Sequence, residues 1–152
     1  MSPLTLHWTC QPFAQLTVHA LYAALRLRAE VFILEQHCLY ADVDGHDPQA
    51  QHLLGWQGET LVAYARLFAP GDKVSGAACI GRVVTAAPAR GQGLGHELMR
   101  HAVAACSRLW PGQPMVLFAQ AHLKGYYAAH GFAEVGPEFV EDGIPHVEMH
   151  RA

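Results

Sequence analysis

The sequence predicts an α/β (α+β) fold in which β-hairpins come first and strand–helix–strand alternation follows. Three observations lead to this expectation. The turn Gln57-Gly58-Glu59 separates two apolar runs, as in a β-hairpin. Apolar residues recur at 3.6-residue spacing from Leu94 to Leu109, which is typical of an amphipathic helix. Met115–Ala119 is wholly apolar, as expected of a strand that is buried on both faces.

Local signals predict the remaining elements. Thr17 is a suitable N-cap for a helix that reaches about Leu34, and Pro111-Gly112 ends the helix that begins at Leu94. Gln36–Ala50 is a long polar loop, and loops of this length are more often functional than idle. In chain order, the expected strands are Leu4–Trp8, His52–Gln57, Thr60–Phe68, Ala77–Thr85, Met115–Ala119, Phe132–Val135 and His146–His150, with a further helix over His122–His130.

Composition excludes several classes of protein. The 152 residues are 51% hydrophobic and 15% charged, which suits one folded domain over residues 1–152 rather than a disordered chain. No apolar run approaches the roughly 18–20 residues of a membrane span, and no secretory signal is present, so we expect a cytoplasmic protein. The four cysteines form no C-x-x-C pair, and Cys38, in a polar stretch, is the candidate for a reactive thiol.

Charge is distributed unevenly along the chain. Lys73–Ala133 contains six basic residues and one acidic residue, a net charge of +5. The remainder contains four basic and twelve acidic residues, a net charge of −8. One part should therefore prefer an anionic ligand and the other a cationic one. Basic runs are lacking, so we expect no nucleic-acid partner.

The loop Arg90-Gly91-Gln92-Gly93-Leu94-Gly95 lies between a predicted strand and a predicted helix. Its three glycines leave backbone N–H groups uncovered at a helix N-terminus, where amides lack partners and the helix dipole is positive. Such a loop suits a pyrophosphate group. The spacing matches neither Gly-x-Gly-x-x-Gly nor a nucleotide P-loop.

These motifs together resemble a known family. Arg-x-x-Gly-x-Gly after Val-Val-Thr is similar to the acetyl-CoA signature of the GNAT superfamily of N-acetyltransferases, and Tyr126–Phe132 (Tyr-Tyr-Ala-Ala-His-Gly-Phe) is similar to a second signature of that superfamily. Leu27–Gln36, Asp42–Asp47 and Ala119–Leu123 resemble its ElaA-like branch. The resemblance implies a mixed, mostly antiparallel sheet of six to seven strands, flanked by helices, that splays at a parallel pair, Ala77–Thr85 and Met115–Ala119.

The resemblance also implies the cofactor site. Acetyl-CoA would be the cosubstrate, its pyrophosphate on the loop amides with the Arg90 charge beside it. The strand backbone would run along the pantetheine arm, and Gln120 stands where many relatives carry an asparagine that touches the cofactor. The expected cofactor-binding residues are Arg82, Val83, Val84, Arg90, Gly91, Gln92, Gly93, Leu94, Gly95, Gln120 and Tyr126.

Transfer would be direct, from the thioester to the amine of a small acceptor. A backbone N–H near Val84 would polarise the thioester carbonyl. Tyr127 matches the general acid of the family, because a phenol is protonated at neutral pH and can donate to a thiolate. Glu35, Asp44 and His46 are candidates for the base or for acceptor binding, and water is the alternative proton acceptor.

Charge further suggests a cationic acceptor, drawn by the acidic loop. Arg28, on an otherwise apolar helix face, would either pair with Glu35 or hold a carboxylate of the substrate. The expected partners are thus a small-molecule amine and no nucleic acid or membrane, with a homodimer as an option.

Two rival functions stay open: a non-catalytic acyl-CoA-binding or sensing module, and a synthase of the acyl-homoserine-lactone type. A functional metal is not expected, because the eleven histidines lack ligand spacing.

Overall fold

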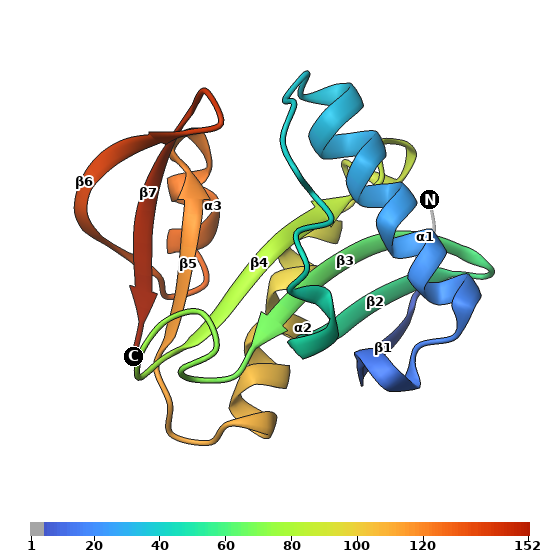
Figure 1. The fold of residues 1–152 in the computed structure, drawn as a ribbon, viewed down its shortest axis with the longest axis horizontal. Coiled ribbons are helices and arrows are strands. Elements are labelled where there is room, and N and C mark those ends of the chain that lie inside the picture. Colours follow the sequence, from blue (N-terminus) through green and yellow to red (C-terminus); the bar gives the residue numbers. More distant parts are fainter. Residues whose placement is uncertain (1–4) are drawn as a thin grey trace.

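The computed structural model describes residues 5–152, which form a seven-stranded mixed sheet flanked by helices (Figure 1). The strand order is β1-β2-β3-β4-β5-β7-β6, and β4 and β5 are its parallel pair. The strands are β1 His7–Pro12, β2 Gln51–Gln57, β3 Thr60–Phe68, β4 Ala78–Thr85, β5 Met115–Gln120, β6 Ala133–Glu141 and β7 Ile144–Arg151. The α-helices are α1 Val18–Arg28, α2 Leu94–Leu109 and α3 Lys124–Ala128. The predicted fold class is confirmed.

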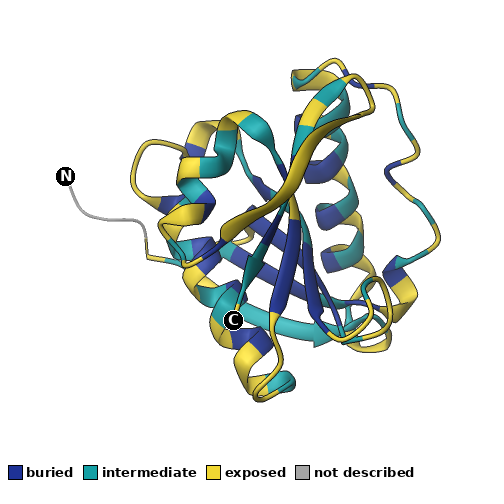
Figure 2. Cartoon of the chain, turned by 90° about the vertical axis from the view of Figure 1, so that its left-hand side faces the viewer, coloured by how far each residue is buried: buried dark blue, intermediate teal, exposed yellow. Residues whose placement is uncertain are grey.

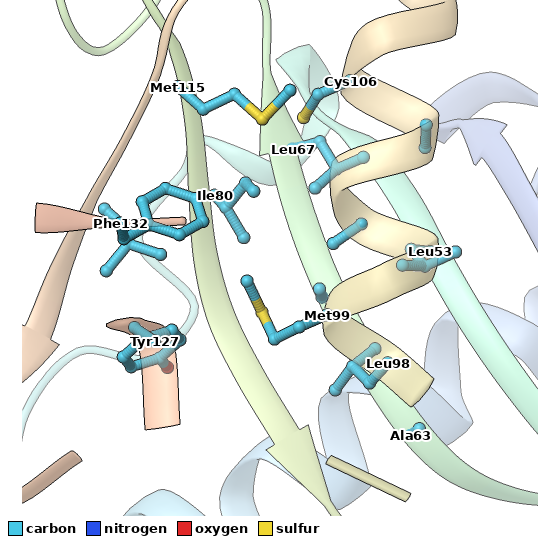
Figure 3. Packing of buried hydrophobic residues seen from close by; sticks show 14 of the residues in the cluster. Leu53, Ala63, Leu67, Ile80, Leu98, Met99, Cys106, Met115, Tyr127 and Phe132 are labelled. Carbon is cyan, nitrogen blue, oxygen red and sulfur yellow. The ribbon is translucent and has the colours of Figure 1, made fainter. Parts of the chain in front are cut away.

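Helices cover both faces of the sheet. Figure 1 shows α1 in front of the sheet and α2 behind it. The larger core cluster lies between α2 and the sheet, and in Figure 3 Leu98, Met99 and Cys106 of α2 point towards Leu67 and Ile80. A second cluster, built around Leu27, Leu54 and Tyr64, packs α1 against the opposite face.

The helix that starts after Thr17 has an unexpected second part. Thr17 caps it as predicted, its hydroxyl accepting from the amide of Ala20. The α-helix ends at Arg28, however, and Ala29–Glu35 continues as π-helix, in which Gln36 N donates to Val31 O five residues back. Such wide turns occur often at functional sites.

Three other expectations on element bounds differ from the structure, and the remaining predicted strands agree with it to within two residues. The first strand is His7–Pro12, and Leu4 of the predicted strand lies outside the described residues. The predicted helix His122–His130 is a 3₁₀ turn at Ala121–Leu123 followed by α3. The strand predicted over Phe132–Val135 extends to Glu141, because Asp142-Gly143 turns the chain into a long β6–β7 hairpin. β6 is exposed along its whole length, and Figure 2 shows it in yellow.

Candidate functional site

The parallel strands β4 and β5 are paired only where they begin. Their register consists of Ala78 with Met115 and Cys79 with Val116. Beyond this point β4 continues along β3 while β5 continues along β7, so the sheet opens between them, as Figure 1 shows. The opening is a cleft of about 870 Å³, lined by both strands, by the segment after α1, by α3 and by the tip of the β6–β7 hairpin. The predicted splay is therefore present.

A bulge shapes the β4 wall of the cleft. Gly81 pairs with Arg66 and Val84 with Tyr64, so two residues of β4 oppose one residue of β3. Arg82, inside the bulge, has φ +50°, a conformation that a non-glycine residue rarely adopts. Extra residues in a bulge leave the ladder and can redirect the strand beside an active site. Arg82, Val83 and Val84 all line this wall of the cleft.

An ion network of three arginines and three aspartates holds this bulge, and we call it the Arg–Asp network. Arg82 Nε donates to Asp42 Oδ1 at 2.8 Å. Arg28 donates to both Asp42 and Asp47, at 3.0 and 2.8 Å. Arg66 binds Asp44 with both terminal nitrogens, at 2.9 and 2.8 Å, and one of them also reaches Asp47 at 2.9 Å. Three positive and three negative charges make this network neutral, and it ties α1, the following loop, β3 and β4 together.

The arginines keep the aspartates ionised. Burial alone would raise the pKa of Asp44, but hydrogen bonds from Arg66 and from the His46 amide outweigh it and lower that pKa. The pKa of Asp47 is lowered in the same way, by Arg28 and Arg66 against burial. Asp44 lines the cleft, yet a carboxylate with so low a pKa is a weak proton acceptor.

The network corrects two expectations from the sequence. Arg28 does not pair with Glu35, and its side chain is 0% exposed and absent from the cleft lining, so it has no access to a substrate. His46 also lies outside the cleft lining and packs edge-on against Phe68, 6.4 Å between ring centroids. Neither residue can contact a ligand in the cleft as it stands.

The glycine loop lies at the mouth of the cleft. Gly91 and Gly93 have φ +91° and +74°, and Gly93 begins α2 without a side-chain cap. Glu97 N is the first helix amide bonded to a carbonyl, that of Gly93, so the amides at positions 94–96 have no partner within the helix. Arg90 and Gly95 both line the cleft. The local structure therefore offers free amides and a positive helix end to an anion.

Arg90 is fixed by two neighbours. It donates to the Thr85 carbonyl at 2.9 Å and to Glu35 Oε2 at 2.7 Å. Glu35 therefore lies beside the glycine loop and lines the cleft. Both side chains of the Arg90–Glu35 ion pair are half-exposed. Sequence reasoning named both residues but did not pair them, since they are 55 positions apart.

Two adjacent tyrosines of α3 face different partners. The Tyr126 hydroxyl donates to the Gly95 carbonyl. A Cβ at Gly95 would lie only 3.3 Å from the Tyr126 hydroxyl oxygen, so glycine suits this close contact. Tyr127 is 7% exposed and belongs to the main core cluster (Figure 3). It also lines the cleft. Burial raises the pKa of the Tyr127 phenol, and Tyr126 raises it further. Tyr127 thus keeps its proton at neutral pH.

The segment after α1 contacts β5 and the tip of the β6–β7 hairpin through its side chains. Gln120 of β5 donates to the Gln36 side chain at 3.1 Å, and the Cys38 thiol lies 3.2 Å from the Asp142 carbonyl. Gln120 also lines the cleft, and part of its amide is already engaged by Gln36. Cys38, the candidate reactive thiol, is buried at 8% exposure and also lines the cleft.

The β6–β7 hairpin adds residues that sequence reasoning missed. Glu141, Asp142 and His146 all line the cleft. His146 sits opposite Gln120 in the sheet, and its Nδ1 lies 2.7 Å from the Ile144 carbonyl. A carbonyl only accepts, so Nδ1 carries the proton and, in the neutral ring, Nε2 is a free base. The Asp142-Gly143 turn between two strand-like runs was the signal for this hairpin.

The comparisons with known proteins agree with this geometry. Residues 17–152 match the family model described as an acetyltransferase (GNAT) domain. The chain belongs to the GNAT acetyltransferase family. It is 41% identical over 148 residues to Protein ElaA of Escherichia coli (strain K12), covering 96% of each chain.

Solved structures show which branch of the GNAT family the chain resembles. The crystal structure of an acyl-CoA N-acyltransferase from Pseudomonas aeruginosa is 49% identical, with a TM-score of 0.93 over 97% of this chain and 100% of that one. The E. coli ElaA crystal structure superposes with a TM-score of 0.91 at 40% identity, over the same shares. The resemblance to the ElaA-like branch is therefore confirmed. The AHL synthase LasI, 14% identical with a TM-score of 0.76, shares the fold alone.

Two negative findings complete the description of this GNAT protein. Within residues 5–152, no three His, Cys, Asp or Glu side chains gather in a way that could bind a metal ion. None of the helices over the same residues is both long and apolar enough to span a bilayer.

Proposed function

We propose that this protein is an acetyl-CoA-dependent N-acetyltransferase that moves an acetyl group directly to the amine of a small acceptor. One observation supports the proposal most strongly. A single cleft joins a glycine loop with free helix amides to a buried phenol, and these are the groups needed to hold a pyrophosphate and to protonate a thiolate.

The residues present fit acetyl-CoA, which supplies an activated acetyl group when bound. The amides of Gly91–Gly95, with Gln92 and Leu94 between the glycines, would hold the pyrophosphate. Arg90 would add its charge, partly offset by Glu35. The bulged backbone Arg82–Val84 would run beside the pantetheine arm, since bulge residues leave groups unpaired in the ladder. Gln120 would contact the arm from β5, and Tyr126 would shape the loop through its bond to Gly95.

Two groups of the chain would act on the reacting atoms. An N–H near Val84 would stabilise negative charge that develops on the carbonyl oxygen. Tyr127 would give its proton to the departing sulfur, which its raised pKa permits at neutral pH. The deep position of Tyr127 in the cleft keeps this proton away from bulk water.

The proton of the acceptor amine needs a second group. Glu35 is one candidate, but Arg90 holds it beside the glycine loop. His146 lies on the opposite wall with an unprotonated Nε2 in its neutral form, so we assign it the role of base. In this arrangement Glu35 orients Arg90 instead.

We further propose that the acceptor is cationic, for a reason different from the one the sequence suggested. Asp42, Asp44 and Asp47 are neutralised by three arginines and exert little net attraction. Glu141 and Asp142 line the cleft from the hairpin tip, and neither forms an ion pair with another residue in the described part of the chain. These two carboxylates would attract a small cationic amine.

Release of free CoA with a panel of polyamines, aminoglycosides and amino acids tests the proposal, with acetylated product identified by mass spectrometry. Turnover of at least one amine that depends on Tyr127 supports it. Tight acetyl-CoA binding without turnover would instead favour the non-catalytic binding module, and lactone formation would favour the synthase.

A further inference from the structure

A second, shallow hollow of about 370 Å³ lies outside the cleft, beside α2. It is lined by Arg100, Val103 and Ala104 of α2, by Ala129–Gly131 after α3, and by Arg151 at the end of β7. All its charged or titratable side chains are basic, and no carboxylate lines it. Neither arginine forms an ion pair with a residue in the range 5–152. The hollow thus concentrates positive charge that the protein leaves uncompensated.

Arg151, one of the basic residues of this hollow, is held in place. Arg151 Nε donates to the His130 carbonyl at 3.0 Å, which leaves the terminal guanidinium nitrogens for other partners. A Cβ at Gly131, which has φ +87°, would lie 2.9 Å from Arg151 Nε, so the close approach needs glycine. An arginine fixed by its inner nitrogen presents a preorganised pair of donors, which suits a phosphate or carboxylate.

Side-chain contacts connect the hollow to the glycine loop. His130 Nε2 lies 2.8 Å from Nδ1 of His96, the residue that follows Gly95. His96 packs on the Tyr126 ring, 5.1 Å between centroids, and Tyr126 holds the Gly95 carbonyl. Arg100 follows Gly95 by five residues, roughly 7.5 Å along the helix axis. A ligand whose pyrophosphate rests on the loop can therefore reach the hollow with a neighbouring group.

The electrostatic environment of the hollow also favours an anionic ligand. Burial lowers the pKa of His130, and the neighbouring basic residues His96, Arg100 and Arg151 lower it further. The site therefore resists additional positive charge and would gain from an anion. The nearest acidic residue of α2, Glu97, is occupied as the acceptor of the Trp8 indole N–H at 3.0 Å.

The geometry points to this hollow, with Arg100, His130 and Arg151, as the binding site for the 3′-phosphate on the adenosine end of coenzyme A. The inference rests on the proposed function, because it assumes that the pyrophosphate of the same molecule lies on Gly91–Gly95. Binding in this hollow would give the protein a selectivity for the 3′-phosphate that the glycine loop alone does not supply. The chain should distinguish acetyl-CoA from acetyl-dephospho-CoA, which lacks only that phosphate.

Calorimetry with both ligands tests the inference. The wild-type chain should bind acetyl-CoA about tenfold more tightly than acetyl-dephospho-CoA, as expected for charge-assisted bonds to a dianion. Arg100→Gln and Arg151→Gln should reduce this ratio towards one while leaving the affinity for acetyl-dephospho-CoA unchanged. Arg108→Gln, on the same helix but outside the hollow, is the matched control and should keep the ratio. Adenosine 3′,5′-bisphosphate should compete with acetyl-CoA, whereas adenosine 5′-monophosphate at equal concentration should compete less.

The outcomes separate this inference from the proposed function. Equal affinity of the wild-type chain for both ligands would overturn the inference and leave the proposed function standing. Failure to bind either ligand would overturn both. Arg100 is exposed, so Arg100→Gln keeps the test decisive even if Arg151→Gln disturbs the packing against Gly131. A ratio that Arg100→Gln leaves unchanged would also contradict the assignment.

Discussion

Arg82 of β4 donates from Nε to Asp42 Oδ1 at 2.8 Å, which joins the bulged wall of the cleft to the loop after α1. Arg82 adopts φ +50°, a left-handed conformation that costs a non-glycine residue about 1–2 kcal/mol. Asp42 therefore fixes a strained residue at the place where the backbone would meet the thioester.

Asp42→Asn should weaken both the fold and the site. It removes the carboxylate that Arg82 Nε binds and one of the two aspartates that Arg28 binds, and breaking a buried pair costs about 3–5 kcal/mol. Urea unfolding should show this loss, and kcat per folded molecule should fall while acetyl-CoA affinity changes little. Asp72→Asn, on an exposed loop, is the control. Lost stability with an unchanged kcat would mean that the bulge does not depend on Asp42.

Acid should unfold the protein through the same network. The pKa values of Asp44 and Asp47 are lower in the folded chain than in the unfolded chain. Their contribution to stability is therefore complete above about pH 4 and is lost as pH falls below it. Unfolding free energies between pH 6 and pH 3 should fall more steeply for the wild-type chain than for Asp44→Asn, which starts less stable. Parallel curves would contradict this linkage.

The two tyrosines of α3 should differ in kinetics. Tyr127→Phe should lower kcat by about 10²–10⁴-fold with little change in acetyl-CoA affinity, since it removes a proton donor to the leaving group. Tyr126→Phe loses only the bond to Gly95 and should act mainly on acetyl-CoA binding. Full activity of Tyr127→Phe at saturating substrate would make Tyr127 a packing residue.

Gly93 tests the cofactor loop through its backbone. No atom lies within 4 Å of a Cβ built there, so the effect of Gly93→Val would come from its φ of +74° rather than from a clash. Calorimetry should show much weaker acetyl-CoA binding for Gly93→Val and a milder loss for Gly93→Asn, because asparagine tolerates this conformation. Equal affinities for all three proteins would remove the loop from the cofactor site.

The hairpin carboxylates test the proposed preference for a cationic acceptor. Glu141→Gln with Asp142→Asn should raise KM for a cationic amine and leave a matched neutral amine unaffected. The KM for the cationic amine should also rise with salt in the wild-type chain as the attraction is screened. If salt and the double substitution affect both amines alike, steering by charge is excluded.

Local patterns predicted most of the fold and the part of the site that is continuous in sequence. The bounds of α2 and the cap at Thr17 follow from apolar spacing and a hydroxyl, and the loop Arg90–Gly95 and Tyr127 lie in short motifs. These features are local, so each can be deduced from a few neighbouring residues.

The remainder depends on contacts between distant residues. Arg82 and Asp42 are 40 positions apart, and Arg90 and Glu35 are 55 apart, so no local period reveals either pair. The charge count correctly located the acidic residues but could not show that arginines of α1, β3 and β4 neutralise three of them. His146 was missed as a site residue because its place in the cleft depends on the length of the β6–β7 hairpin.

The most direct test of the proposed acetyl transfer measures free CoA and acetylated amine together, by thiol release and mass spectrometry, with purified protein and acetyl-CoA over an amine panel. Both products should appear in equal amounts with a small amine, and Tyr127→Phe should suppress both while still binding acetyl-CoA. Saturable acetyl-CoA binding with no acetylated amine from any member of the panel would contradict it.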